Sequence, residues 1–186
     1  IPRLLCSRIK SFRRRGAETA YGIMMAETRK KRFLLYLIKP SHYDDAGYVI
    51  QWFRSSIPSN SLASLYGLAA DCRDRRVLGE DVELDIEAVD ETNTRIRPDR
   101  IARLIRDQGG RGLVGLVGVQ SNQFPRAMDI ARPLRKAGIQ VCIGGFHVSG
   151  CMAMLPELPP DLKEAQSLGI SFFAGDAEGR LDPVLK

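Results

Sequence analysis

Apolar residues from position 33 onward fall into short runs separated by polar and helical stretches. The runs at 33–38, 113–119, 141–143 and 170–173 are almost continuously apolar, which is typical of strands buried on both faces of a sheet. Residues 82–88 differ, because apolar side chains alternate there with acidic ones. Such alternation indicates a half-exposed strand at a sheet edge. The pattern therefore predicts five β-strands.

Helical patterns occupy the intervals between these strands. Ser59 or Asn60 can cap the first helix. Pro98 suits the first turn of the second helix, and Gly109 suits its end. Pro133 lies inside the third pattern, which it is expected to kink or shorten. The expected helices begin at residue 59 or 60, at 98, before 127, at 161 and at 178.

Regular alternation of strand and helix indicates a parallel sheet with right-handed crossovers. We therefore expect an α/β fold, a flavodoxin-like (Rossmann-type) doubly wound five-stranded parallel sheet with the strand order 2-1-3-4-5. Ligands of such sheets bind at the carboxyl ends of the strands, where the strand order reverses. A ligand site is therefore expected at those ends.

The charge of the chain divides it into two parts. The 186 residues carry a net charge of +6, but residues 1–32 hold ten Lys and Arg against two Glu, a net of +8, and residues 33–186 have a net of −2. We interpret 1–32 as a disordered or non-native extension, with Met25 as a plausible natural start. A basic tail can also bind nucleic acid, but that partner is not expected here. Residues 33–186 form the predicted domain.

Cysteine spacing and hydropathy narrow the class of protein. The four cysteines show neither a paired spacing nor a zinc-type cluster with histidine, which favours a reducing, cytoplasmic setting. The apolar runs are of strand length, much shorter than the roughly 20 residues of a membrane helix. No membrane partner is therefore expected.

Small and polar residues follow the last three predicted strands. Glycines allow close backbone approach, and the hydroxyl, amide, imidazole and carboxylate groups can hydrogen-bond a ligand. Each group has an ordinary alternative role: turn formation after the third strand, a structural histidine after the fourth, and helix capping by Asp176 or Glu178 after the fifth. The candidate ligand floor consists of Ser121, Asn122, Gly144, Gly145, His147, Gly175 and Glu178.

Two familiar nucleotide sites are absent. The glycine-rich segment 112–118 is not followed by Lys-Ser or Lys-Thr, which a phosphate loop requires. Its glycines lie within the predicted strand, whereas a dinucleotide fingerprint places them in a turn that opens a helix. No nucleophile, base and orienting partner are visible together near the strand ends. The sequence therefore favours ligand binding over catalysis by this segment alone.

At these residues the chain resembles the cobalamin-binding domain that precedes the catalytic barrel in many radical SAM enzymes. The resemblance covers residues 33–186. One departure is clear: enzymes with a histidine lower ligand carry Asp-x-His-x-x-Gly after the first strand, whereas here Pro40 and Asp45 stand at the Asp and Gly positions around His42. The segments that carry the resemblance are the strand ending at Pro40 and the stretches 57–63, 144–147 and 175–178.

The resemblance implies that a corrinoid lies on the carboxyl ends of the strands, with its nucleotide tail running into the domain. Ser121, Asn122, Gly144, Gly145 and His147 would line that surface, with Gly175 and Glu178 nearby. The Cys-x-x-x-Cys-x-x-Cys motif for a 4Fe-4S cluster and S-adenosylmethionine is missing, so the resemblance implies that it lies in a downstream radical SAM domain and that this segment alone is not the enzyme.

Two other interpretations stay open. The domain could be a degenerate relative that binds no corrinoid and serves as a docking surface for the radical SAM barrel. It could also be an independent flavodoxin-like binder of a nucleotide or flavin, although no phosphate-cradling loop supports that interpretation.

Overall fold

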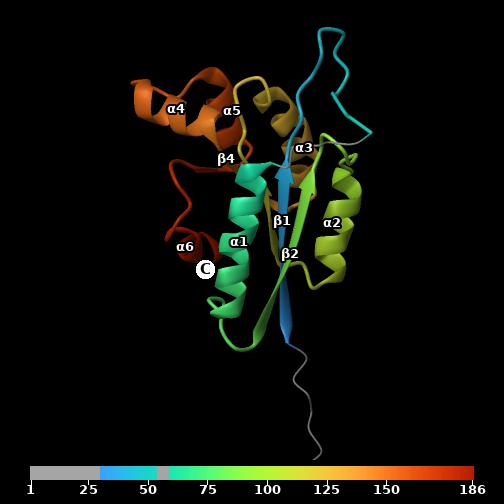
Figure 1. Ribbon diagram of the computed structural model, residues 1–186, viewed down its shortest axis with the longest axis vertical. Coiled ribbons are helices and arrows are strands. Elements are labelled where there is room, and N and C mark those ends of the chain that lie inside the picture. Colours follow the sequence, from blue (N-terminus) through green and yellow to red (C-terminus); the bar gives the residue numbers. More distant parts are fainter. Residues whose placement is uncertain (1–29, 54–58) are drawn as a thin grey trace, which may run out of the picture.

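The computed structural model of the chain describes residues 30–53 and 59–186. Five parallel strands form one sheet in the order β2-β1-β3-β4-β5 (Figure 1), which confirms the predicted fold class and strand order. The half-exposed second strand lies at the sheet edge, as its alternating pattern predicts. The strands are β1 (Lys31–Lys39), β2 (Val82–Asp90), β3 (Gly112–Leu116), β4 (Gln140–Gly144) and β5 (Ser171–Phe173).

Helices cover both faces of this sheet (Figure 1). Ser59 is the N-cap of the first helix, where its hydroxyl accepts a hydrogen bond from the backbone N–H of Leu62 at 3.3 Å. The third helix continues for three residues beyond Pro133, so the proline does not end it. The helices are α1 (Asn60–Asp74), α2 (Pro98–Asp107), α3 (Phe124–Lys136), α4 (Phe146–Met154), α5 (Pro160–Ser167) and α6 (Leu181–Leu185).

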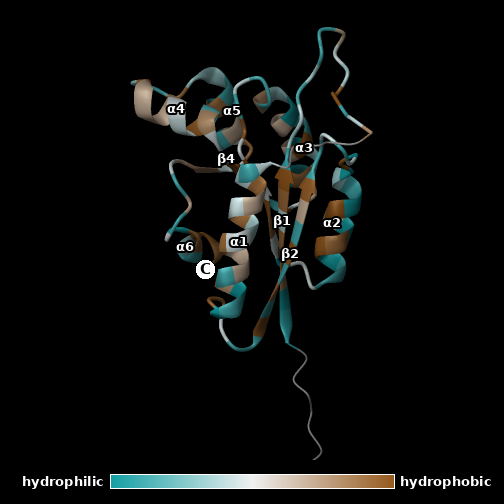
Figure 2. Cartoon of the chain, in the orientation of Figure 1, coloured by the Kyte–Doolittle hydropathy of each residue, from teal (hydrophilic) through white to brown (hydrophobic). Residues whose placement is uncertain are grey.

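The apolar side chains form one core on each face of the sheet. Helices α2, α3, α4 and α5 contribute to the larger core, and α1 and α6 contribute to the smaller one. The apolar colours of Figure 2 accordingly run along the central strands and the inner sides of the helices. Continuous apolarity in β1, β3 and β4 is therefore the consequence of burial between two helical layers, as the sequence predicts.

Two expectations about local structure are wrong. The third strand ends at Leu116 and does not reach residue 119, because Gly118 adopts a φ of +62°, which turns the chain off the sheet. Residues 144–147, where the sequence predicted no helix, divide between the end of β4 and the start of α4. Helix α4 was not predicted because it lacks the charged face that identifies a surface helix. In its nine residues the polar His147 and Ser149 stand singly between apolar residues, and Gly150 lies at the centre.

Hydrogen bonds organise the described part of the long loop after β1. The Asp44 carboxylate accepts from the backbone N–H groups of Ala46 and Tyr48, and Tyr43 and Val49 form an antiparallel bridge. The aromatic side chains of Tyr48 and Trp52 in this loop are 74% and 62% exposed. The loop is therefore ordered by polar contacts.

A buried ion pair anchors that loop to the body of the domain. Glu91, only 1% exposed, accepts hydrogen bonds from the Arg126 guanidinium, the shortest at 2.6 Å, and from the backbone N–H of Ser41 at 3.1 Å. The Ser41 hydroxyl in turn donates to the carbonyl of Ile50 at 2.5 Å. Arg126 lies on α3 and Glu91 directly follows β2. The ion pair therefore connects α3 with the end of β2, and the Ser41 hydrogen bond connects both to the loop after β1.

The predictions for residues 1–29, and for Ile57 and Pro58 of the 57–63 stretch, concern positions outside the described residues. In the part of the chain that the structure describes, no helix has the length and apolarity needed to cross a membrane.

We predict that Arg126→Met lowers the free energy of unfolding by about 3–5 kcal/mol, because it leaves the Glu91 carboxylate buried and without its cation. Arg132→Met is the matched control on the same helix, since its ion pair with Glu164 is about half exposed and is expected to contribute less than about 1 kcal/mol. Urea denaturation of both variants measures the difference. Equal, small losses would show that the buried pair does not anchor the loop.

Candidate functional site

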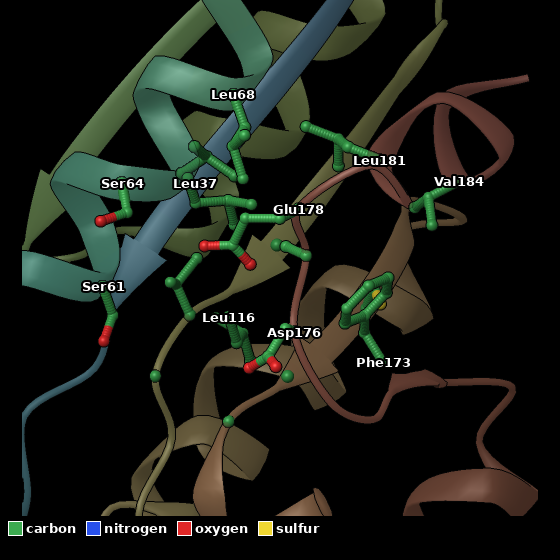
Figure 3. A pocket seen from close by; sticks show the side chains of 18 of the residues that line it. Leu37, Ser61, Ser64, Leu68, Leu116, Phe173, Asp176, Glu178, Leu181 and Val184 are labelled. Carbon is green, nitrogen blue, oxygen red and sulfur yellow. The ribbon is translucent and has the colours of Figure 1, made fainter.

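An apolar cleft opens on the α1 face of the sheet, between α1, the tips of β3 and β4, and the segment that joins β5 to α6 (Figure 3). Its volume is about 390 Å³, within the range of small-molecule and cofactor pockets, about 300–1,000 Å³. Leucines of β1, α1 and α6 form much of its wall.

The cleft exists because the strands beneath it carry small residues on this face. Gly115, Cys142 and Gly144 line the cleft, whereas the opposite face of the same two strands carries fully buried branched side chains. Burial raises the pKa of the Cys142 thiol to about 11, so the thiol is neutral at physiological pH and acts as a small apolar group. The branched side chains of the opposite face are Val114, Val141, Ile143 and Leu116, and Leu116, at the tip of β3, also lines the cleft.

Polar groups lie around the mouth of the cleft. Ser61 and Ser64 approach from α1, and Asp176 and Glu178 approach from the segment after β5, with the Glu178 carboxylate extending toward α1 (Figure 3). Within residues 30–53 and 59–186, none of these four side chains has a hydrogen-bond or ion-pair partner. The mouth therefore offers two hydroxyls and two carboxylates to a ligand.

Lys39 adds a cation beside that mouth. It ends β1, and a Cβ placed on Gly118 would lie 3.8 Å from its Cδ and 3.0 Å from the Cβ of Ser61. Burial lowers the pKa of the Lys39 amine, partly offset by the nearby Asp90 carboxylate. This is the point between β1 and β3 where the strand order reverses and where ligands of such sheets bind.

A second, shallow depression lies directly on the carboxyl edge of the sheet. Gln120, Ser121, Asn122 and Phe146 line it, and its volume is about 550 Å³. Phe146 is 76% exposed, so an apolar ring forms part of the floor. Gly145 lines the cleft, and Phe146, the next residue along the chain, lines the depression.

The backbone conformation at position 145 requires glycine. Its φ of +140° and ψ of −170° belong to a region that essentially only glycine occupies. A Cβ there would lie 2.2 Å from the backbone nitrogen of Val119. The sequence predicted that the two glycines allow a close backbone approach, and this approach is to the loop after β3. A hydrogen bond from the backbone N–H of His147 to the Val119 carbonyl, at 3.0 Å, holds the two segments together.

His147 does not lie free on the ligand floor. Its Nδ1 is 3.1 Å from the Ser121 Oγ, and its Nε2 is 2.9 Å from the Asp161 Oδ2. The imidazole packs against the Phe124 ring at a centroid distance of 4.5 Å, and its side chain is 12% exposed. Both ring nitrogens are therefore engaged within the protein.

This arrangement corrects one expectation from the sequence. No nucleophile, base and orienting carboxylate were visible together, yet the fold brings Ser121, His147 and Asp161 into one hydrogen-bonded chain. Asp161 was missed because it lies on α5, 14 residues beyond the histidine and across an unpredicted helix. No local spacing signal could have revealed it.

The segment after β5 differs from the capping interpretation. Helix α6 begins at Leu181 with Arg180 as N-cap and no side-chain cap, so neither Asp176 nor Glu178 caps it. Gly175, with a φ of +86°, donates its N–H to the Ser149 Oγ at 3.0 Å, which ties this segment to α4. Arg180 lies over the Phe173 ring at 5.0 Å and donates to the Ala174 carbonyl at 3.0 Å.

The predicted site residues thus form two groups. Gly144, Gly145, Gly175 and Glu178 line the cleft, whereas Ser121 and Asn122 line the depression. His147 supports the second group from below through Ser121. Among residues 30–53 and 59–186, no group of three or more His, Cys, Asp or Glu side chains is arranged to hold a metal ion.

No family model, curated protein or solved structure matches the chain.

We predict that Gly145→Ala destabilises the fold, with about 1–3 kcal/mol from backbone strain alone and more from the overlap with Val119. Gly150→Ala is the matched control, because a Cβ there meets nothing within 4 Å and Ala is favoured over Gly inside a helix by about 1 kcal/mol. Thermal unfolding of the two variants checks this. An unchanged stability of Gly145→Ala would mean that Gly145 does not approach the Val119 backbone this closely.

Proposed function

We propose that this domain binds a cobalamin for a radical SAM enzyme. The observation that carries the proposal is a pair of concavities whose lining residues Gly145 and Phe146 are consecutive in the chain: a shallow depression on the sheet edge and a deeper apolar cleft on the α1 face. A corrinoid has two matching parts, a broad macrocycle and a nucleotide tail. The depression suits the first part, and the cleft suits the second.

The residues present fit such a ligand. The glycines and Cys142 leave the floor of the cleft without bulky side chains, so a flat heterocycle can approach the backbone. Ser61, Ser64 and Glu178 offer hydrogen bonds to the hydroxyl groups of a sugar, and Lys39 lies where a phosphate group would be attracted. Ser121, Asn122 and the Phe146 ring would contact the macrocycle.

The chemistry of this proposal belongs to the cofactor. When bound, a corrinoid supplies a methyl group or an organometallic centre, and the protein supplies binding and orientation. His147 is not proposed as an axial ligand, because Ser121 and Asp161 occupy both of its nitrogens. The 4Fe-4S cluster and S-adenosylmethionine are proposed for a separate radical SAM domain of the same chain.

A second function is favoured by a different observation. Helix α4 carries no charged residue, only Val148 of it is buried, and Phe146, Met152 and Met154 are 76%, 50% and 81% exposed. A helix that is apolar all round is normally covered by protein. The alternative is therefore a domain that binds no corrinoid and docks a radical SAM barrel on this face.

Titration with hydroxocobalamin, followed by its visible spectrum and by retention on gel filtration, tests the first function. We predict that Ser64→Trp, which fills the cleft from α1, weakens binding at least about tenfold, since a blocked pocket loses well over 1.4 kcal/mol. Ala63→Trp is the matched control, because Ala63 is exposed on the same helix and does not line the cleft.

Cobinamide, which lacks the nucleotide tail, separates the two concavities. Cobinamide has no nucleotide tail to enter the cleft, so Ser64→Trp should leave its binding within about twofold of the unaltered protein. Changes at separate, independent sites affect each other by less than about 0.5 kcal/mol. Absence of any cobalamin binding would reject the first function and leave the docking function. Equal losses for both corrinoids would reject the assignment of the tail to the cleft.

A further inference from the structure

The hydrogen-bonded side chains of Ser121, His147 and Asp161 suggest a role besides cofactor binding. Its three side chains come from three different elements: the loop after β3, the first turn of α4 and the first turn of α5. The contacts are 3.1 Å from the serine oxygen to one imidazole nitrogen and 2.9 Å from the other nitrogen to the carboxylate. We propose that these residues activate Ser121 as a nucleophile toward small esters.

The carboxylate determines which imidazole nitrogen carries the proton. An ionised Asp161 can only accept, so Nε2 of a neutral His147 must donate to it. Nδ1 then presents its lone pair to the Ser121 hydroxyl, which is the arrangement of a general base next to a nucleophile. The two nitrogens exchange the roles they have in the familiar serine hydrolases, but the chemistry of the ring is equivalent.

The base is held firmly in this orientation. The Phe124 ring packs on the imidazole, and the side chain of His147 is 12% exposed. Asp161 is fixed in turn, since its Oδ1 accepts from the Leu162 N–H at 2.8 Å. Asp161 is thus a positioning residue that acts through His147, and Ser121 and His147 are the groups that would contact the reacting atoms.

The surroundings of Ser121 leave room for a substrate. Ser121 is exposed and lines the open depression beside Phe146. The backbone N–H groups of Ser121 and Asn122 have no hydrogen-bond acceptor among the residues described here. An N–H on the residue that follows the nucleophile is a common donor to the oxyanion of acyl transfer.

The proposed reaction needs only the ester and water, and no added cofactor. The Ser121 Oγ bonds to the ester carbonyl carbon while its proton passes to Nδ1 of His147, and the carbonyl oxygen becomes an oxyanion. Collapse of this intermediate breaks the bond to the alcohol, which leaves with the proton from Nδ1. Water then repeats the two steps on the acyl-serine and releases the carboxylic acid. The Phe146 floor favours a short apolar acyl group.

A fluorophosphonate probe tests the proposal in the absence of any corrinoid, so the result is independent of cobalamin binding. Labelling is measured by mass spectrometry: the Ser121 oxygen bonds to phosphorus as fluoride leaves. We expect labelling at Ser121, its complete loss in Ser121→Ala, and a rate at least about 100-fold lower in His147→Gln. Ser171→Ala, which removes an exposed serine on β5, should label like the unaltered protein.

Imidazole ¹⁵N NMR of His147 distinguishes this role from simple packing. The unaltered protein should show Nε2 protonated and Nδ1 unprotonated, and Asp161→Asn should shift the proton toward Nδ1 and lower the labelling rate with the fold retained by circular dichroism. A protonated Nδ1 in the unaltered protein would overturn the proposal. So would labelling at another serine, or no labelling of the folded protein.

Discussion

The close contact of Gly145, just after β4, with Val119 in the loop after β3 is the contact on which the rest of this site depends. The backbone of Gly145 lies so close to Val119 that no side chain fits between them. This contact separates the cleft from the depression and sets the start of α4. It thereby also places His147 beside Ser121. The backbone conformation of Gly145 thus helps to position the residues on both sides of it, Gly144 in the cleft and His147 beside Ser121.

The sheet supplies the second constraint through the sizes of its side chains. On the α2 and α3 face, β3 and β4 carry branched residues that fill the larger core. On the α1 face the same strands carry Gly115, Cys142 and Gly144, and α1 and α6 do not fill the space that these small residues leave. The cleft is therefore a local deficit of side-chain volume in an otherwise close-packed domain.

Much of the fold was predictable because its signals are local. Continuous and alternating apolar patterns identified the five strands, and the edge position of β2 followed from Glu83, Asp85 and Glu87. Helix α4 was missed because its apolar composition lacks the polar face that identifies a surface helix. The helix that was missed carries Phe146 and His147, which belong to the candidate site.

The site itself was only partly predictable. Most of the glycine and polar residues predicted at the strand ends line the cleft or the depression, yet spacing along the chain could not show that His147 turns toward Asp161. Nor could it show that Gly145 serves a contact within the chain, or that Asp176 and Glu178 line a cleft and cap no helix. These features depend on packing between elements that lie far apart in sequence.

If one ligand spans the depression and the cleft across Gly145, its binding must perturb both at once. Amide chemical-shift changes in a ¹H–¹⁵N NMR spectrum, recorded as hydroxocobalamin is added, measure this. We expect changes at Gly118, Ser121, Asn122, Gly144 and Glu178 together, with little change on α2. Changes confined to one of the two concavities, or found on α2, would contradict it.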